Sequence, residues 1–179
     1  MKHAPYTEPL YHSIIDMLQS YHPSSPRQQQ LKHHFLSHRH PQSCRKDFLS
    51  PGHFTASGFV CTPDMQQLVL IFHHRFQKWI QPGGHLEKTD THILEAAKRE
   101  IAEETGLTQP QFTGRIHLDL HHVPKTSKQS AHEHWDIQLL FTHTHTPLNG
   151  DLRGVWTAIK TLSQDQSDES VMRFVEILL

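Results

Sequence analysis

The sequence predicts an α/β fold, a sandwich in which helices pack on a mixed β-sheet. Apolar residues recur at helical spacing in several segments, which indicates amphipathic helices. Between them lie short runs rich in β-branched and aromatic residues, bounded by turn residues, which is typical of strands. The 179 residues are about the size of one domain with its own core. This order of elements therefore favours helices on both sides of one sheet.

Residues 1–50 are predicted to form a helical extension. Apolar residues recur at helical spacing through residues 10–21, and Pro26 suits the first turn of a second helix. Leu31, Phe35 and Leu36 would form the buried face of that helix. Two short helices bury too little surface to be stable alone, so we expect them to pack on the core domain, residues 51–179, or on a second subunit.

The core domain is predicted to contain five strands and two helices. The expected strands are Phe54 to Cys61, Leu68 to Phe72, Arg115 to Val123, His134 to Thr142 and Gly154 to Ile159. Gly83 and Gly84 indicate a loop. Helices are expected from Thr91 to Thr105, ended by Gly106, and from Asp168 to Leu178.

Composition excludes several classes of protein. The 17 lysines and arginines nearly balance 18 aspartates and glutamates, so no nucleic-acid partner is expected. No apolar run approaches the ~20 residues of a membrane helix, and the first residues lack the apolar run of a signal peptide, so we expect a cytoplasmic protein. Cys44 and Cys61 lack metal-site spacing and are expected to be reduced thiols.

The 19 histidines are the unusual feature of the composition. They are scattered through predicted helices, strands and loops without zinc-finger spacing. A zinc site needs three or four converging ligands. We therefore interpret the histidines as exposed polar residues.

The chemistry is concentrated on the helix that follows Gly83 and Gly84. At 100° per residue, Glu100, Glu103 and Glu104 fall within roughly one third of the helix circumference. An apolar stripe runs beside them, formed by Ile93, Leu94, Ala97 and Ile101. The alternative to a functional site is that the glutamates belong to the solvated face of a glutamate-rich helix. The stripe and the double glycine instead favour a carboxylate row that binds a hard cation such as Mg²⁺ or Mn²⁺.

This segment resembles the Nudix box, which consists of a glycine, five residues, a glutamate, seven residues, and then Arg-Glu-aliphatic-any-Glu-Glu-any-Gly-aliphatic. The second half matches at every fixed position, from Arg99 to Leu107. In the first half, counted from Gly84, Asp90 stands at the glutamate position, and eight residues rather than seven separate it from Arg99. The loop ahead of the helix is therefore expected to carry one extra residue.

The resemblance implies a metal-dependent hydrolase that cleaves a diphosphate (pyrophosphate) linkage in a nucleoside diphosphate derivative or a similar small metabolite. It implies that Glu100, Glu103 and Glu104 bind Mg²⁺ or Mn²⁺, with the main chain of Gly83 as a further ligand. Arg99 would position a metal-binding glutamate. The general base is left open between Glu100 and a carboxylate of a later loop, for which the candidates are Glu133, Asp151, Asp168 and Glu169.

Substrate contacts are predicted at Arg75 and His85. Arg75 is expected on the strand before the double glycine, where a guanidinium suits a phosphate. The segment from His132 to Asp136 is interpreted first as a polar loop. Pro124 lies in a region where ADP-ribose hydrolases of the family carry a proline, so an ADP-ribose-like substrate is one expectation.

Two alternatives stay open at this stage. An enzyme like isopentenyl diphosphate isomerase shares the fold and uses a cysteine with a glutamate, for which Cys61 is the candidate. A non-catalytic ligand sensor of the same fold, with the N-terminal helices as its interaction surface, is the other. A homodimer is allowed by the sequence but not required.

Overall fold

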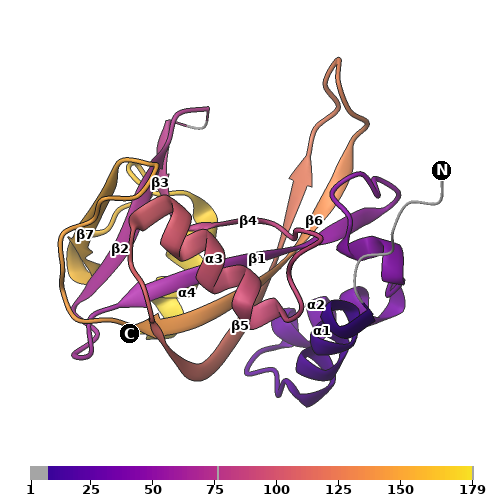
Figure 1. Ribbon diagram of the computed structural model, residues 1–179, viewed down its shortest axis with the longest axis horizontal. Coiled ribbons are helices and arrows are strands. Elements are labelled where there is room, and N and C mark those ends of the chain that lie inside the picture. The colour runs from indigo at the N-terminus through magenta and orange to yellow at the C-terminus, as the bar shows by residue number, and fades with distance from the viewer. Residues whose placement is uncertain (1–7, 76, 179) are drawn as a thin grey trace. The chain divides into compact units, whose positions relative to one another are not determined.

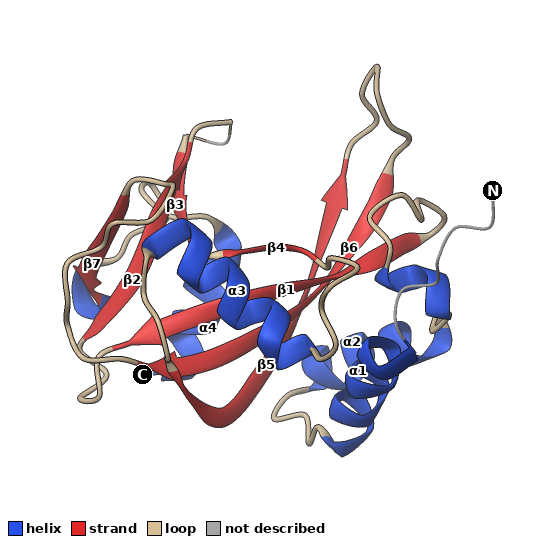
Figure 2. Ribbon diagram, viewed as in Figure 1, coloured by secondary structure: helices blue, strands red, loops and turns tan. Residues whose placement is uncertain are grey.

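The structure, a computed structural model, describes residues 8–75 and 77–178 (Figure 1). In the core domain, groups of consecutive strands are separated by single helices (Figure 2). The helices are α1 (Glu8–Ser20), α2 (Pro26–Ser37), α3 (Ile93–Thr105) and α4 (Glu169–Leu178), with 3-10 turns at Pro41–Cys44 and Ile159–Thr161. The strands are β1 (Gly52–Cys61), β2 (Gln67–His73), β3 (Lys78–Ile80), β4 (Gly83–His85), β5 (Gln111–Val123), β6 (His132–Thr142) and β7 (Gly154–Ala158).

The predicted α/β class, with N-terminal helices and a mixed sheet, is confirmed. Several local expectations are wrong, among them the start of β5, which lies at Gln111 rather than at Arg115. Gly83 and Gly84 belong to strand β4 rather than to a loop, and α3 begins at Ile93 rather than at Thr91. Strand β6 already begins at His132. The three-residue strand β3 was not predicted.

The seven strands described belong to one sheet, in which the order β3-β2-β1-β6-β5 is joined by β4 on β1 and by β7 on β2. Strand β2 pairs antiparallel with β1, β3 and β7. Strand β7 pairs with β2 from Gln67 to Ile71, and β3 pairs with it from Ile71 to His73. These two short strands therefore follow one another along β2.

The chain divides into two compact units. Of the described residues, the first unit comprises 8–56, 84–96 and 116–138, and the second comprises 57–75, 77–83, 97–115 and 139–178. Strands β1, β5 and β6 and helix α3 each contribute residues to both units.

In the second unit, helices lie on both faces of the sheet. Phe59 of β1 faces α4, where its ring stacks on that of Phe174 with 3.6 Å between centroids. Gly58, the preceding residue, faces α3, because a Cβ at this position would collide with the side chain of Ile101. Successive residues of a strand point to opposite faces. The second unit is therefore an α/β/α sandwich, as the sequence predicted.

In the first unit, α2 packs on the sheet. Its Phe35 is fully buried, with ring centroids 6.1 Å from Phe54 of β1 and 6.2 Å from Trp135 of β6. Its Gln28 accepts a hydrogen bond from the backbone N–H of Leu118 and donates one to the carbonyl of the same residue, both at 2.8 Å. This side chain thus satisfies main-chain groups of β5 that another strand would otherwise bind.

No helix in the described part of the chain is long and apolar enough to cross a membrane.

Candidate active site

Helix α3 carries the three glutamates on a packed scaffold. Ile93, Ala96, Ala97 and Ile101 are fully buried, at the i, i+3, i+4 spacing of an amphipathic helix. Leu94, which the sequence placed in this stripe, is only partly buried. The glutamates lie beside the stripe, and their side chains remain 12% exposed for Glu100 and 50% for Glu103.

The extra residue of the box lies ahead of the helix, as predicted. Helix α3 runs unbroken from Ile93 to Thr105. In the preceding loop, Asp90 is buried, and its Oδ2 accepts a hydrogen bond from the backbone N–H of Glu87 at 2.8 Å. The N–H of Leu94 donates to Nδ1 of His92, so His92 caps the first turn. The glutamate register on the helix is therefore undisturbed.

The C-terminal end of α3 is held by a backbone clamp, residues 149–152. The N–H groups of Asn149, Asp151 and Leu152 donate to the carbonyls of Thr105, Glu103 and Glu104, at 3.0, 2.8 and 3.3 Å. These are among the last four carbonyls of the helix, which have no partner within it. The clamp therefore fixes the turn that carries two of the glutamates. Gly106, predicted as the helix end, has the positive φ of 75° that suits a C-terminal glycine.

Glu104 occupies the most unusual electrostatic position of the row. Its Oε2 accepts a hydrogen bond from the backbone N–H of Gly83 at 2.9 Å. Its pKa is raised from 4.5 to about 7. Burial is the largest cause, the Gly83 hydrogen bond opposes it, and the negative charges of Glu100 and Glu103 add to it. An ionised Glu104 is therefore poorly compensated by the protein itself.

Arg99 binds the other two carboxylates. One guanidinium nitrogen donates to Glu100 at 2.7 Å and to Glu103 at 3.1 Å. The pair with Glu103 is an i,i+4 contact along the helix. The arginine is only 19% exposed, so these pairs are partly shielded from water. Arg99 thus fixes the direction of two of the three carboxylates.

The three glutamates do not converge on one point. A group of potential metal ligands is one in which three or more ligand atoms lie within 4.8 Å of one another. Among the described residues, one such group exists, and it consists of histidines rather than of these glutamates. The donor set still suits a hard cation, because it consists of carboxylate oxygens, and the raised pKa of Glu104 shows that its negative charge lacks compensation within the protein. At Gly83 the structure places the backbone N–H, rather than a carbonyl, against Glu104.

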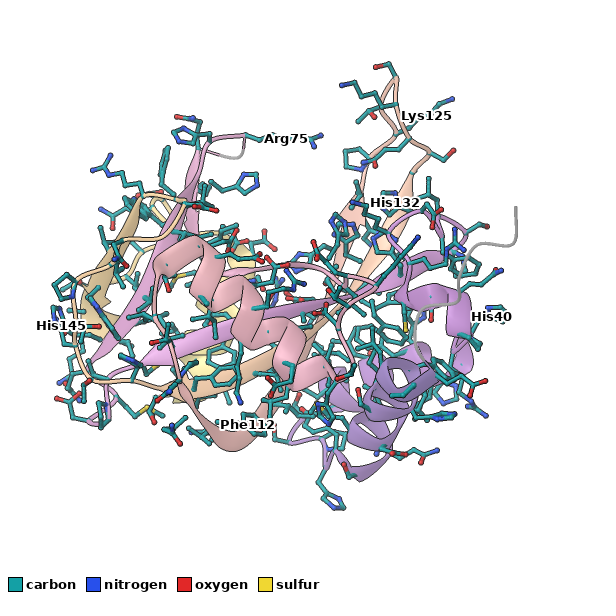
Figure 3. All side chains as sticks on the ribbon, in the orientation of Figure 1. His40, Arg75, Phe112, Lys125, His132 and His145 are labelled. Carbon is teal, nitrogen blue, oxygen red and sulfur yellow. The ribbon has the colours of Figure 1, made fainter. Side chains whose placement is uncertain are left out.

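The two predicted substrate residues lie in different surroundings. Arg75 is exposed, in the turn that follows β2 and not on the strand itself, because β2 ends at His73 (Figure 3). His85 ends β4, and its ring centroid lies 5.2 Å from that of His53 and 5.1 Å from that of His134. The position of Arg75 in a turn corrects the expectation that it lies on the strand.

The four later carboxylates have distinct local partners. Asp168 caps α4 by accepting from the N–H of Val171 at 2.9 Å, and Glu169 is exposed and pairs with Arg173 on the same helix. Glu133 accepts hydrogen bonds from the indole of Trp135 and binds the ring of His34. Asp151 belongs to the backbone clamp at the end of α3.

A histidine cluster is the feature that the sequence analysis missed. His53 and His132 are buried, which corrects their interpretation as exposed polar residues. The segment from His132 to Asp136 is the first part of a buried strand rather than a polar loop. The signal present in the sequence was the alternation His132-x-His134, which places two imidazoles on one face of a strand.

The comparison with known proteins decides the family. A family model for the NUDIX domain matches residues 52–174, more than half of the chain. The chain belongs to the NUDIX family. This confirms the resemblance that residues 84–107 carried, and it places the N-terminal helices ahead of the matched region.

Individual relatives of this NUDIX chain are similar over limited parts of the sequence. Phosphatase NudJ of Escherichia coli K12 is 55% identical over 40 residues, which are 22% of this chain and 26% of that protein. The match thus spans about a quarter of the curated relative.

Solved structures align with the chain at low identity. The dihydroneopterin triphosphate pyrophosphohydrolase of E. coli aligns with a TM-score of 0.51 at 12% identity, over 69% of this chain and 92% of that one. The NUDIX domain of Shewanella oneidensis NrtR, solved with ADP ribose, aligns with a TM-score of 0.49 at 16% identity, over 80% and 94%.

Proposed function

We propose that this NUDIX chain is a metal-dependent hydrolase that cleaves the diphosphate linkage of a small phosphorylated metabolite. A nucleoside diphosphate derivative such as ADP-ribose is the substrate class we favour. The observation that carries the proposal is the state of Glu104, a largely buried carboxyl whose charged neighbours are the negative Glu100 and Glu103. Such an arrangement opposes its own ionisation, and a bound cation removes that opposition.

Glu100, Glu103 and Glu104, with the main chain at Gly83, would hold Mg²⁺ or Mn²⁺. When bound, the metal neutralises charge on the diphosphate oxygens and lowers the pKa of the attacking water. Arg99 holds Glu100 and Glu103 in fixed directions through its two hydrogen bonds. The Gly83 N–H does the same for one oxygen of Glu104. The chain's own contribution is thus a row of pre-positioned carboxylates.

For the general base we propose Glu100, which lies within the row and is shielded from water by its pair with Arg99. Two of the later carboxylates serve α4, as a cap and as an exposed surface pair. Asp151 is the rival that lies on the clamp at the end of α3. Comparing Glu100→Gln with Asp151→Asn tests this choice. The base variant should flatten the rise of kcat with pH, and the other should not.

For substrate binding we propose Arg75 and His85. Arg75 is exposed in a turn, and its planar guanidinium suits a phosphate group. His85 presents an imidazole at the end of β4. Each substitution to Gln should raise KM more than it lowers kcat, because neither residue is proposed to act on the reacting atoms.

The isomerase alternative needs a reactive cysteine. Cys61 is fully buried, and burial raises its pKa to about 12, with the positive charge of Arg115 opposing the shift. A neutral, buried thiol is a poor catalyst. Cys44 is likewise buried, with its pKa raised to about 12 by burial. Both thiols are free, which suits the proposed cytoplasmic location.

The test is a substrate panel that includes ADP-ribose, sugar nucleotides, dinucleoside polyphosphates, nucleoside triphosphates and CoA, each with Mg²⁺ or Mn²⁺. We expect metal-dependent release of two phosphate-bearing products from a diphosphate substrate. Conversion of isopentenyl diphosphate to its isomer would favour the isomerase. Tight binding of a panel compound without turnover would favour a ligand sensor.

A further inference from the structure

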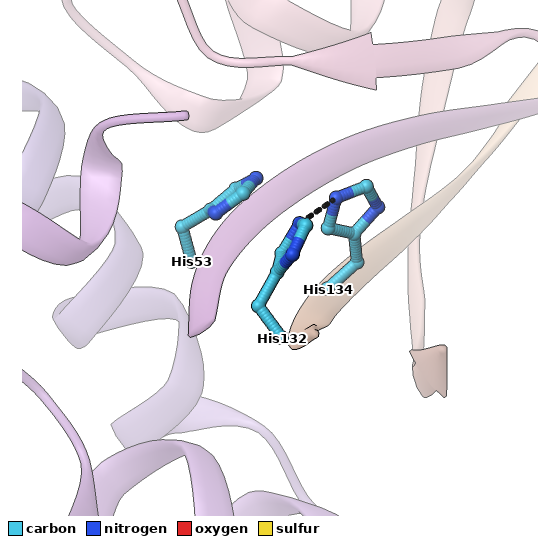
Figure 4. Close-up of side chains that lie close together, drawn as sticks. All are labelled: His53, His132 and His134. Carbon is cyan, nitrogen blue, oxygen red and sulfur yellow. Dashed lines mark hydrogen bonds between the residues drawn. The ribbon is translucent and has the colours of Figure 1, made fainter. Parts of the chain in front are cut away.

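Three histidines converge in the first unit, and none of them belongs to the sequence motif, residues 84–107, that defines the family. His53 lies at the start of β1, and His132 and His134 lie at the start of β6 (Figure 4). The two strands are neighbours in the sheet, and the backbone N–H of Glu133 donates to the carbonyl of Pro51 at 3.0 Å, which fixes their ends side by side. One ring nitrogen from each histidine lies within 4.8 Å of the other two.

Second hydrogen bonds set the tautomers of two of these rings. Nδ1 of His53 lies 3.1 Å from the carbonyl oxygen of Phe48, and Nδ1 of His132 lies 2.9 Å from that of Ser130. A carbonyl only accepts, so each Nδ1 carries the proton and each Nε2 presents its lone pair. Proteins orient metal-binding histidines through this same arrangement.

His53 supplies the observation that points most directly to a ligand. The residue is fully buried, and its Nε2 has no hydrogen-bond partner. A buried polar atom without a partner is uncommon in folded proteins and calls for an explanation, of which an absent ion is one. Burial also keeps the ring neutral by lowering its pKa to about 4. Neutral imidazole is the form that binds metals.

The spacing of the other two rings fits direct coordination. Nε2 of His132 and Nε2 of His134 are 3.2 Å apart. Two nitrogens that each lie ~2.0–2.1 Å from a tetrahedral zinc ion are separated by ~3.3 Å. In the metal-free protein His134 can donate a hydrogen bond across this gap, and an ion would take its place.

We propose that His53, His132 and His134 bind one Zn²⁺ or a similar transition-metal ion. Imidazole nitrogens suit Zn²⁺, Co²⁺, Ni²⁺ and Cu²⁺, whereas Mg²⁺ prefers oxygen, so this site differs in chemistry from the glutamates of α3. A water molecule would take the fourth position. His132 also lines a pocket of about 380 Å³ together with Pro51 and Glu133. The bound ion cross-links the starts of β1 and β6.

The test uses the full chain without a histidine tag, titrated with ZnCl₂ or CoCl₂ while excess Mg²⁺ saturates the carboxylates. We expect one tight equivalent of Zn²⁺ and a higher Tm for the loaded protein. With Co²⁺ we expect the strong visible absorption of a four-coordinate ion. Weak, multiple binding with the spectrum of hexahydrated Co²⁺ would overturn the proposal.

Matched variants separate this cluster from the many surface histidines. His134→Gln changes the least buried of the three ligands and should weaken Zn²⁺ binding at least about tenfold. His33→Gln changes a histidine of α2 outside the cluster and should leave the tight equivalent intact. Equal losses in both variants would overturn the proposal. Because the metal-free Tm reports the fold of each variant, His53→Asn serves as a second ligand variant if His134→Gln proves unstable.

Discussion

At the scale of single residues, Glu104 lowers the stability of the fold in its charged form, and the proposed chemistry requires that same charge. Its carboxyl is largely removed from water, and the charges of Glu100 and Glu103 repel its own. Without a cation, the protein gains stability if this charge disappears. Residues that lower the stability of the fold in this way are typical of functional sites, where activity is gained at the expense of stability.

Glu104→Gln keeps the shape of the side chain and removes its charge. We expect turnover to fall by on the order of a hundredfold or more, because a dominant electrostatic contact is lost. The Tm of the metal-free protein should hold or rise, since one member of a self-repelling group is gone. Mg²⁺ should raise the Tm of the wild type more than that of the variant. Steady-state kinetics and thermal denaturation with and without metal measure these effects.

The matched control is Glu95→Gln, a glutamate in the first turn of the same helix. It should leave turnover and metal response almost unchanged. Near-normal turnover in Glu104→Gln, or equal damage from Glu95→Gln, would contradict the proposed role of the glutamate row.

The stability of the metal-free protein should also depend on pH through Glu104. Its pKa is raised in the folded protein, from 4.5 to about 7, so the folded state binds the proton more tightly than the unfolded state does. The resulting stability is present below pH 4.5 and is lost as the pH rises to about 7. Urea denaturation across this window should show a decline that Glu104→Gln reduces. An identical decline in both proteins would assign the effect to other groups.

At the scale of elements, the sequence predicted what local periodicity controls. The short runs rich in β-branched and aromatic residues identified both β1 and β2, because most of their side chains are buried in the core. Strand β4 was wrongly predicted as a loop because two of its three residues are glycines, and its pairing with β1 depends on distant residues. The box helix was predicted with its glutamate register, since that register depends only on spacing along one helix.

The histidine cluster could not be predicted from local periodicity. His53 lies about eighty positions before His132, and only the pairing of β1 with β6 brings the two together. Likewise, the clamp on α3 links Glu103 to Asp151 through the main chain, which no side-chain pattern records. Spacing predicts which residues share a face of one element, but not which elements meet.

The clamp itself is open to test through Gly150. A Cβ at this position would collide with the backbone of Glu104 and Thr105. Gly150→Ala should therefore displace the loop from the end of α3 and destabilise the protein by about 1–3 kcal/mol. It should also lower turnover, because the last turn of α3 carries Glu103 and Glu104. Urea denaturation and steady-state kinetics report the two effects.

Gly114→Ala is the control for this substitution. Gly114 has a φ of 83°, so alanine is strained there, but its Cβ would meet no atom within 4 Å. We expect a comparable loss of stability from backbone strain, without the loss of turnover. Equal turnover in the two variants would show that the clamp does not position the glutamates.

At the scale of the whole molecule, the N-terminal helices supply core residues rather than only a surface. The family match begins at residue 52, so α1 and α2 lie outside it. Yet Leu10, Ile14, Leu18 and Phe35 are fully buried, and the side chain of Ser13 accepts a hydrogen bond from the backbone N–H of Ile93 at the start of α3. The boundary at residue 50 stays a prediction. These contacts argue that the two helices fold together with the NUDIX domain.

A chain that begins at Gly52 tests whether the catalytic domain stands alone. Its loss of α2 would expose Phe54 and Trp135, both fully buried in the intact chain, and would remove the partner of Leu118 on β5. We expect Tm to fall by more than about 5 °C, or the chain to aggregate through the uncovered surface.

Phe35→Ala should reproduce part of this loss and lower the free energy of unfolding by about 3–5 kcal/mol, because it leaves a cavity beneath two aromatic rings. Leu36→Ala, on the same helix but only partly buried, should cost much less. If the shortened chain instead stays monomeric with an unchanged Tm, the helices are an independent extension. Their buried faces would then serve a partner other than this chain's own core.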